Sequence, residues 1–128
     1  MPMKLFSAAL IVLVIAVAPA FGGQRVRSDV EIDNYHGEGD EVVFSGVVSS
    51  PKHACEKRRK VLVIGRDEQA GNAKRIMGRD RTGPQGRFDV REQIPFLEDY
   101  VWAKLKRARP DNGTKCKGAR SKEISTAG

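Results

Sequence analysis

The sequence predicts an all-β protein, a Greek-key β-sandwich of about seven short strands. Apolar and polar residues alternate over short runs rich in β-branched side chains, as in strands with one buried face. Clusters of glycine, proline, asparagine and aspartate separate these runs at regular spacing. No long segment has the period of an amphipathic helix. The expected strands span residues 29–35, 41–49, 60–66, 73–79, 87–90, 100–107 and 116–124.

Four of these strands come first along the chain. Residues 29–35 alternate between acidic and apolar side chains, which indicates a half-buried strand. Residues 41–49 have the strongest β pattern, in which Gly46 marks a bulge or a close backbone contact. Residues 60–66 are apolar on both faces and are therefore expected at the centre of a sheet. Residues 73–79 form a weaker strand.

A glycine-rich loop at residues 80–86 separates these strands from the rest of the domain. Gly83 and Gly86 are expected to form its turn, which leads into the strand at residues 87–90. Residues 91–99 contain a proline that argues against a long helix, so they form either one helical turn or a covering loop.

The last two strands flank a predicted hairpin turn. Residues 100–107 alternate again, and Asn112-Gly113 favours a tight turn because both residues tolerate positive φ angles. Residues 116–124 hold few apolar side chains and are expected at a sheet edge. The predicted core side chains are Phe44, Val61, Val63, Phe88, Val101 and Leu105.

Residues 1–20 have the parts of a secretory signal peptide: Lys4, an apolar run, and the small residues Ala18-Pro19-Ala20 at a cleavage site. The alternative is a membrane anchor, but the apolar run is shorter than the roughly 18–20 residues that span a bilayer. We therefore expect a secreted, extracellular protein. The expected organisation is a signal peptide at 1–20, a flexible leader at 21–28, one β-sandwich domain at 29–125 and a tail at 126–128.

The two cysteines, Cys55 and Cys116, are expected to form a disulfide, because exported proteins mature in oxidising surroundings. The alternative pairs Cys55 with His53 as a nucleophile and its base. Because the exported chain has a second cysteine, a disulfide is favoured over a nucleophilic role for Cys55.

The chain contains, in this order, the motifs Phe44-Ser45-Gly46-Val47-Val48, Cys55, Arg59-Lys60-Val61-Leu62-Val63, Asp80-x-Thr82-Gly83-x-x-Gly86-x-Phe88, Val101-x-Ala103-Lys104-Leu105 and Cys116-x-Gly118-Ala119-Arg120-Ser121. Together they resemble the transthyretin-like, carboxypeptidase regulatory-domain-like β-sandwiches, and in particular their small secreted bacterial members with two cysteines. The resemblance covers residues 42–124 and implies an accessory, adhesive or structural module without a defined reaction. Some relatives form an internal lysine–asparagine bond, but the first matching strand lacks the lysine.

The net charge of +7 has two interpretations. It could attract an anionic partner, or it could reflect ordinary solubility. The densest basic run is Lys57-Arg58-Arg59-Lys60. We include it in a candidate binding surface for an anionic polymer, a glycan or a cell-surface protein.

A second part of the candidate surface lies on the strand at residues 100–107. If the alternate apolar residues face inward, Trp102 lies outward between Tyr100, Lys104 and Lys106. An aromatic ring beside cations suits a polyanion or a sugar. The alternative is that another layer of the protein covers Trp102 as part of the core.

We expect a monomer that is not an enzyme and holds neither a cofactor nor a metal. His36 lies near Glu38 and Asp40, but zinc sites draw three or four closely spaced ligands. The sequence therefore predicts a non-enzymatic secreted module with a structural, binding or adhesive role. The alternatives are a cationic effector that binds an anionic polymer or surface and, less favoured, a small hydrolase or inhibitor.

Overall fold

The computed structural model describes residues 24–126, so the expected signal peptide at residues 1–20 lies outside the described residues. Within them the fold is all-β, as predicted, with eleven short strands in three sheets rather than about seven strands. Two single 3-10 turns, η2 (His53–Cys55) and η3 (Glu68–Ala70), interrupt the strands. No helix between residues 24 and 126 is long and apolar enough to cross a membrane.

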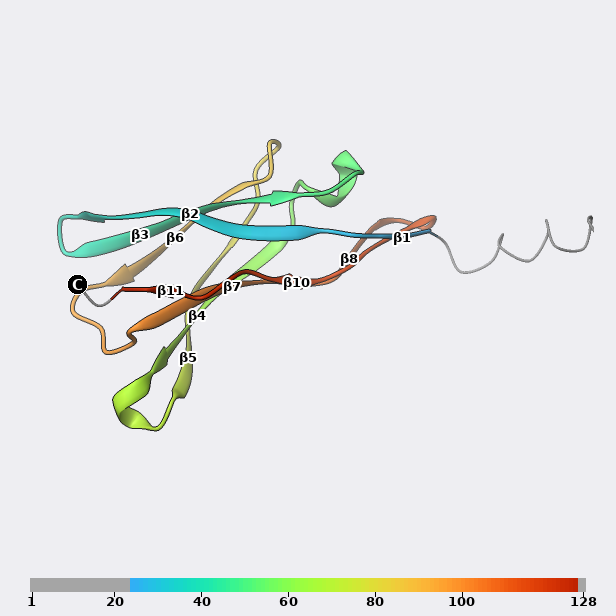
Figure 1. Cartoon of the computed structure of the whole chain (residues 1–128). Helices are drawn as coiled ribbons and strands as arrows, with labels where there is room; N and C mark the ends of the chain where they lie inside the picture. Colours follow the sequence, from blue (N-terminus) through green and yellow to red (C-terminus); the bar gives the residue numbers. More distant parts are fainter. Residues whose placement is uncertain (1–23, 127–128) are drawn as a thin grey trace, which may run out of the picture.

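The first sheet has three antiparallel strands in the order β2-β3-β6. Its hairpin turns at Gly39 and Asp40, so the first strand is longer than predicted. Figure 1 shows this sheet as one layer of the protein, with its hairpin turn at one end. The strands are β2 (Asp29–Glu38), β3 (Glu41–Ser49) and β6 (Arg87–Gln93).

The second sheet lies on the other side of the core, in the order β10-β7-β4-β5, and β11 also pairs with β7. The apolar strand β4 is central, as its sequence indicates. The strands are β4 (Lys60–Asp67), β5 (Ala73–Arg81), β7 (Tyr100–Leu105), β10 (Ala119–Arg120) and β11 (Ile124–Ser125).

A third, smaller sheet extends one end of the protein (Figure 1). In it β1 (Gln24–Val26) pairs in parallel with β9 (Thr114–Cys116), which forms a hairpin with β8 (Ala108–Asp111). Two expectations differ from this arrangement. Gln24–Val26 lies inside the segment expected to be a flexible leader, and the single edge strand expected at residues 116–124 is divided among β9, β10 and β11.

The main core lies between the first and second sheets, because strands of both sheets supply its side chains. Strand β7 shows how alternation produces it: Val101, Ala103 and Leu105 are buried and face the core. All six predicted core residues belong to it. Its buried members are Val30, Val42, Phe44, Val48, Val61, Val63, Met77, Phe88, Val90, Val101, Ala103 and Leu105.

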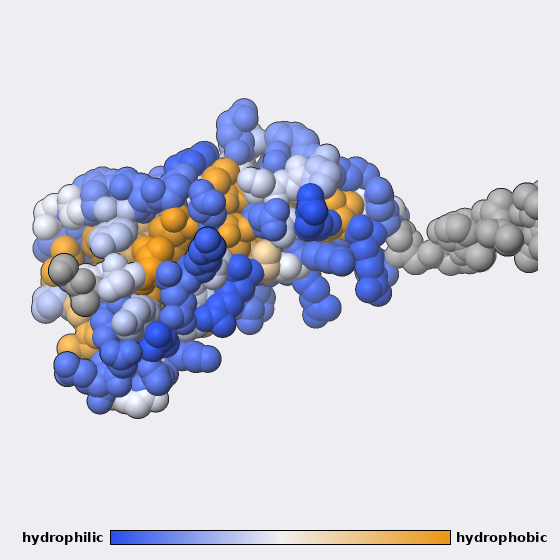
Figure 2. All heavy atoms as spheres, viewed as in Figure 1, coloured by the Kyte–Doolittle hydropathy of each residue, from blue (hydrophilic) through white to orange (hydrophobic). Residues whose placement is uncertain are grey.

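One edge of the molecule leaves apolar atoms visible between the two layers. Figure 2 shows an apolar strip in the middle of this face, bordered by hydrophilic residues. Ile32 and Ile124 are partly buried against the core, and together with Tyr35 they line a shallow hollow. The short strands β10 and β11 thus cover this edge of the core incompletely.

The segment after β6 is a covering loop rather than a helical turn. Phe96 packs against the core, with its ring centroid 6.3 Å from that of Phe44. Glu98 is buried and pairs with Arg75 at 2.7 Å, and this ion pair lowers the pKa of Glu98.

The predicted turn at Asn112-Gly113 joins β8 to β9, but neither residue has a positive φ angle. The Asp111 carboxylate instead accepts a hydrogen bond from the Gly113 amide at 2.9 Å. In the loop at residues 80–86, Gly86 has a φ of 80° whereas Gly83 does not require a left-handed backbone. Only Gly86 of the predicted pair is therefore needed for its φ angle.

Gly46 is needed for space. A side chain there would overlap the Glu31 carbonyl oxygen and the Phe88 ring, so the backbone of β3 approaches both neighbouring strands closely. We expect Gly46→Ala to lower the free energy of unfolding by about 1 to 3 kcal/mol, because the core must shift to admit a methyl group. Gly83→Ala is the matched control, since nothing lies within 4 Å of its added carbon. Urea denaturation of both variants tests this, and equal midpoints would contradict it.

Candidate functional site

The two cysteines form the predicted disulfide. It joins Cys55 in η2 to Cys116 in β9, with the two Cα atoms 5.6 Å apart. Val26 and Ala108 pack around it in a second, smaller apolar cluster. Closing a loop with a sequence separation of 61 is worth about 4 kcal/mol in the chain-entropy model, so the third sheet is held covalently to the start of β4.

Arg59 is buried, which corrects its expected place on the binding surface. Its Nη1 donates hydrogen bonds to Ser28 Oγ at 3.0 Å and to the Cys55 carbonyl at 2.7 Å. Its Nη2 donates to the carbonyls of Lys106 at 2.7 Å and Lys117 at 2.9 Å. The sequence does not reveal this role, because Arg59 stands in a run of basic residues whose members Lys57 and Arg58 are exposed.

The Arg59 guanidinium has no carboxylate partner among the described residues. All four acceptors are neutral, and its Nε has no hydrogen-bond partner. Burial accordingly lowers the pKa of Arg59, since removal from water disfavours the charged form. A positive charge is thus held inside this end of the protein without a counter-charge.

Trp102 combines features of both predicted alternatives. It alternates with the core-facing residues of β7 and so lies on the outer face of the sheet, yet it is only 3% exposed. Cations lie over its ring: the Arg120 guanidinium carbon is 4.3 Å from the ring centroid and Lys74 Nζ is 5.9 Å away. The tryptophan is therefore covered by basic side chains and not by another sheet.

The cation over Trp102 is held by a network that reaches Tyr100. Glu123 pairs with Arg120 at 3.1 Å and with Arg66 at 3.0 Å. Arg66 in turn lies 4.1 Å from the Tyr100 ring centroid. These pairings lower the pKa of Glu123 and raise that of Arg66. The network orders the side chains on the outer face of the second sheet.

A groove of about 950 Å³ lies over Trp102, along the outer face of β7. Lys104 and Lys106, which the sequence places on the outward face of this strand, are exposed and line the groove. Lys74, Arg107 and Arg120 line it as well, and the sequence analysis did not select them. The groove thus contains five cations and no carboxylate.

Two further hollows continue this surface. One of about 440 Å³ shares Arg107 with the groove and is also lined by Arg25, Lys115 and Lys117. The other, of about 480 Å³, shares Arg109 with that hollow. We call the exposed and partly exposed cations of the three hollows the basic belt: Arg25, Lys57, Arg58, Lys74, Arg81, Lys104, Lys106, Arg107, Arg109, Lys115, Lys117 and Arg120.

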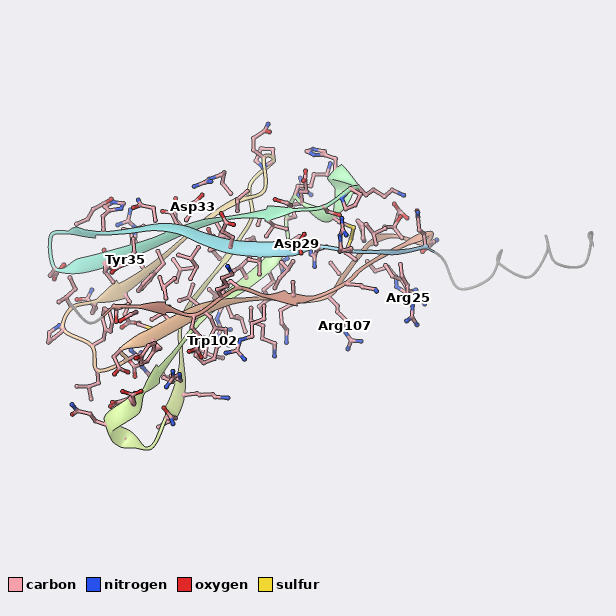
Figure 3. The ribbon with its side chains drawn as sticks, viewed as in Figure 1. Arg25, Asp29, Asp33, Tyr35, Trp102 and Arg107 are labelled. Carbon is pink, nitrogen blue, oxygen red and sulfur yellow. A yellow bond between two sulfur atoms is a disulfide. The ribbon has the colours of Figure 1, made fainter. Side chains whose placement is uncertain are left out.

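Figure 3 shows the belt residues Arg25 and Arg107 at the end formed by the third sheet, whereas Asp33 and Tyr35 lie toward the other end. No Asp or Glu side chain lines any of the three hollows. Arg120 is the single belt cation with an ion pair among the described residues. Positive charge is therefore concentrated along one continuous surface.

Two arginines of β6, in the first sheet, are instead neutralised by carboxylates of β2. Arg87 pairs with Asp33 at 2.8 Å, and Arg91 pairs with Glu38 at 3.1 Å. Each pairing raises the pKa of the arginine. The contrast with the belt means that the net charge of the chain is unevenly distributed over its surface.

The remaining sequence candidates are engaged in local contacts. His36 pairs with Glu38 at 2.8 Å, and His53 with Glu56 at 3.2 Å. Residues 24–126 contain no cluster of three or more histidine, cysteine, aspartate or glutamate side chains that could hold a metal ion. Lys60, the end of the predicted basic run, is partly buried and lies outside the belt.

Comparison with protein-family models, curated proteins and solved structures found no match for this chain. The transthyretin-like assignment therefore stays a prediction from the order of the sequence motifs.

Replacing Arg59 tests its buried role. Arg59→Met removes the donors to four acceptors, and we expect the free energy of unfolding to fall by roughly 3 to 5 kcal/mol because buried carbonyls lose their partners. Arg58→Met at the exposed neighbouring position should change stability far less. Thermal or urea unfolding of the two variants measures this, and similar losses would show that the Arg59 contacts are unimportant.

Removing the cation over Trp102 should expose its ring. The chain contains one tryptophan, so its fluorescence reports this position alone. We expect Arg120→Ala to shift the emission maximum to longer wavelength and to increase quenching by iodide, because water gains access to the indole. Lys122→Ala, in the connection that follows β10 and outside the groove lining, is the control. Unchanged spectra for both variants would contradict the arrangement.

Proposed function

We propose that the protein is a non-enzymatic, secreted binding module that attaches to an anionic polymer at the cell exterior through the basic belt. The observation that carries this proposal is the continuity of three cation-lined hollows without a carboxylate in their walls. Ordinary solubility does not require cations to be gathered in this way. A continuous run of hollows suits an extended ligand better than a small one.

The proposal includes a transthyretin-like Greek-key β-sandwich as the scaffold. Two sheets that share one core, with a disulfide at one end, are compatible with that class. The signal-peptide pattern of residues 1–20 and the disulfide both support secretion. A purely structural or adhesive role without a polyanion is the main competing proposal.

The groove over Trp102 favours charge over stacking as the mode of recognition. The indole is nearly inaccessible beneath Arg120 and Lys74, so a base or sugar ring would have to displace a cation to reach it. Cations in the belt can contact successive anionic groups without such a rearrangement. We therefore expect binding that depends weakly on the sequence or ring type of the polymer.

Salt dependence tests the proposal. Fluorescence anisotropy with labelled heparin, and in parallel with labelled single-stranded DNA, should give affinities that fall steeply as salt rises, because binding releases counterions. We expect the Lys104→Gln/Lys106→Gln variant to reduce the slope of log affinity against log salt for DNA by roughly 1.4, about 0.7 for each lost contact. Competition by polyglutamate would show whether charge alone is sufficient.

The matched control removes the same charge elsewhere. Arg87→Gln/Arg91→Gln deletes two cations that are paired with carboxylates outside the belt. This variant should keep the wild-type salt slope. Equal reductions in both double variants would mean that net charge, and not the belt, governs binding. Absence of binding at low salt would remove the proposal.

A further inference from the structure

One hollow of the belt differs from the others because a buried charge forms part of its wall. It lies between the turn that precedes β4, the end of β5, and β8. Its cationic lining residues are Lys57, Arg58, Arg59, Arg81 and Arg109, and its other lining residues are alanine and proline. Four arginines thus line a space of about 480 Å³.

Backbone contacts bring these arginines together. The Arg58 amide donates to the Thr82 carbonyl at 2.9 Å, and Arg81 Nη1 donates to the Arg58 carbonyl at 3.2 Å. The Arg59 amide donates to Thr82 Oγ1 at 2.8 Å. Arg58 and Arg59, which precede β4, and Arg81, at the end of β5, are therefore fixed near one another, although like charges repel.

Two acidic side chains close to these arginines in the sequence are engaged elsewhere. Glu56 accepts hydrogen bonds from the Ser50 amide and lies beside His53. Asp80, which precedes Arg81, accepts from the Asp89 amide at 2.9 Å. None of the five lining cations forms an ion pair with a described carboxylate. The hollow therefore has an unneutralised positive potential.

Arg59 supplies a second, independent observation. It is 1% exposed, all its acceptors are neutral, and its Nε has no hydrogen-bond partner. A buried cation without a counter-ion is costly, and an anion bound in the adjoining hollow would reduce that cost. Arginine is suited to the task because its planar donors match the oxygens of phosphate and sulfate groups.

We propose that this hollow is a specific site for a tetrahedral oxyanion, a phosphate or sulfate ester group, held by Arg58, Arg81 and Arg109 next to the buried Arg59. A carboxylate offers two oxygens in one plane, whereas a sulfate ester or a phosphate monoester offers three terminal oxygens in a tetrahedral arrangement. The inference rests on the proposed function in one respect, namely that the oxyanion is carried by the polymer bound along the belt. The site itself can be tested with free anions.

The experiment is a two-dimensional ¹H–¹⁵N NMR titration of the oxidised protein with sodium phosphate and, separately, sodium sulfate at constant ionic strength set by chloride. We expect saturable shifts confined to the amides and arginine side chains of residues 57–59, 81–82 and 108–109. Arg58→Gln/Arg81→Gln should weaken binding by at least about tenfold, since it removes two charge-assisted contacts. Both positions are exposed, so the variant should fold.

Arg75→Gln/Arg87→Gln is the control, because it removes the same charge at arginines paired with carboxylates. It should bind phosphate and sulfate as the wild type does. Three results would overturn the site and indicate an adventitious ion only: chemical-shift changes spread over all basic residues, equal weakening of binding in both double variants, or the absence of any saturable change.

Binding measurements with two polymers distinguish sulfate from phosphate as the bound group, and distinguish the oxyanion site from the belt proposal. Heparin supplies sulfate groups and polyphosphate supplies phosphate groups. If the Arg58→Gln/Arg81→Gln variant loses more affinity than the control for one of these polymers, that polymer identifies the source of the bound group. If both polymers bind this variant as they bind the control, the belt proposal stands and the oxyanion site fails. If free anions bind at the site but neither polymer does, the site stands and the proposed function fails.

Discussion

The buried guanidinium of Arg59 is the contact on which one end of this protein depends. Its four acceptors belong to four separate stretches of chain: the connection before β2, η2, the connection after β7 and the connection after β9. No apolar side chain could satisfy three carbonyl groups at once, so the position requires a fork of donors. Burying the charge is unfavourable, but the four hydrogen bonds fix these stretches of chain relative to one another.

The disulfide and Arg59 act on the same segments and so determine where the belt lies. Cys55 provides both a sulfur for the covalent link and a carbonyl for Arg59. The carbonyls of Lys106 and Lys117 turn inward to Arg59, while both residues keep exposed side chains. Inward hydrogen bonding of the backbone therefore accompanies outward display of the cations. In this region the features that stabilise the fold also shape the candidate site.

The sequence predicted those elements that local patterns determine. Alternation located strands β2 to β7 and the core-facing side of β7, and the cysteine pair was predicted correctly. Contacts between distant segments were missed. Gln24–Val26 becomes a strand only because β9 lies beside it, and Arg59 is buried by carbonyls from four places along the chain. Trp102 is covered by Lys74 and Arg120, which come from other parts of the chain. The many lysines and arginines between residues 104 and 122 do indicate part of the belt in the sequence.

The long covalent loop has a consequence for how the chain would respond to proteolysis. The exposed turn η3, which joins the end of β4 to the start of β5, lies between Cys55 and Cys116 in the chain. A protease that cut there would produce two polypeptides, but the disulfide would still join them, and the cut ends would remain paired within the second sheet. Release of either fragment would require reduction as well as cleavage, so a nicked molecule would keep both halves of its basic surface together.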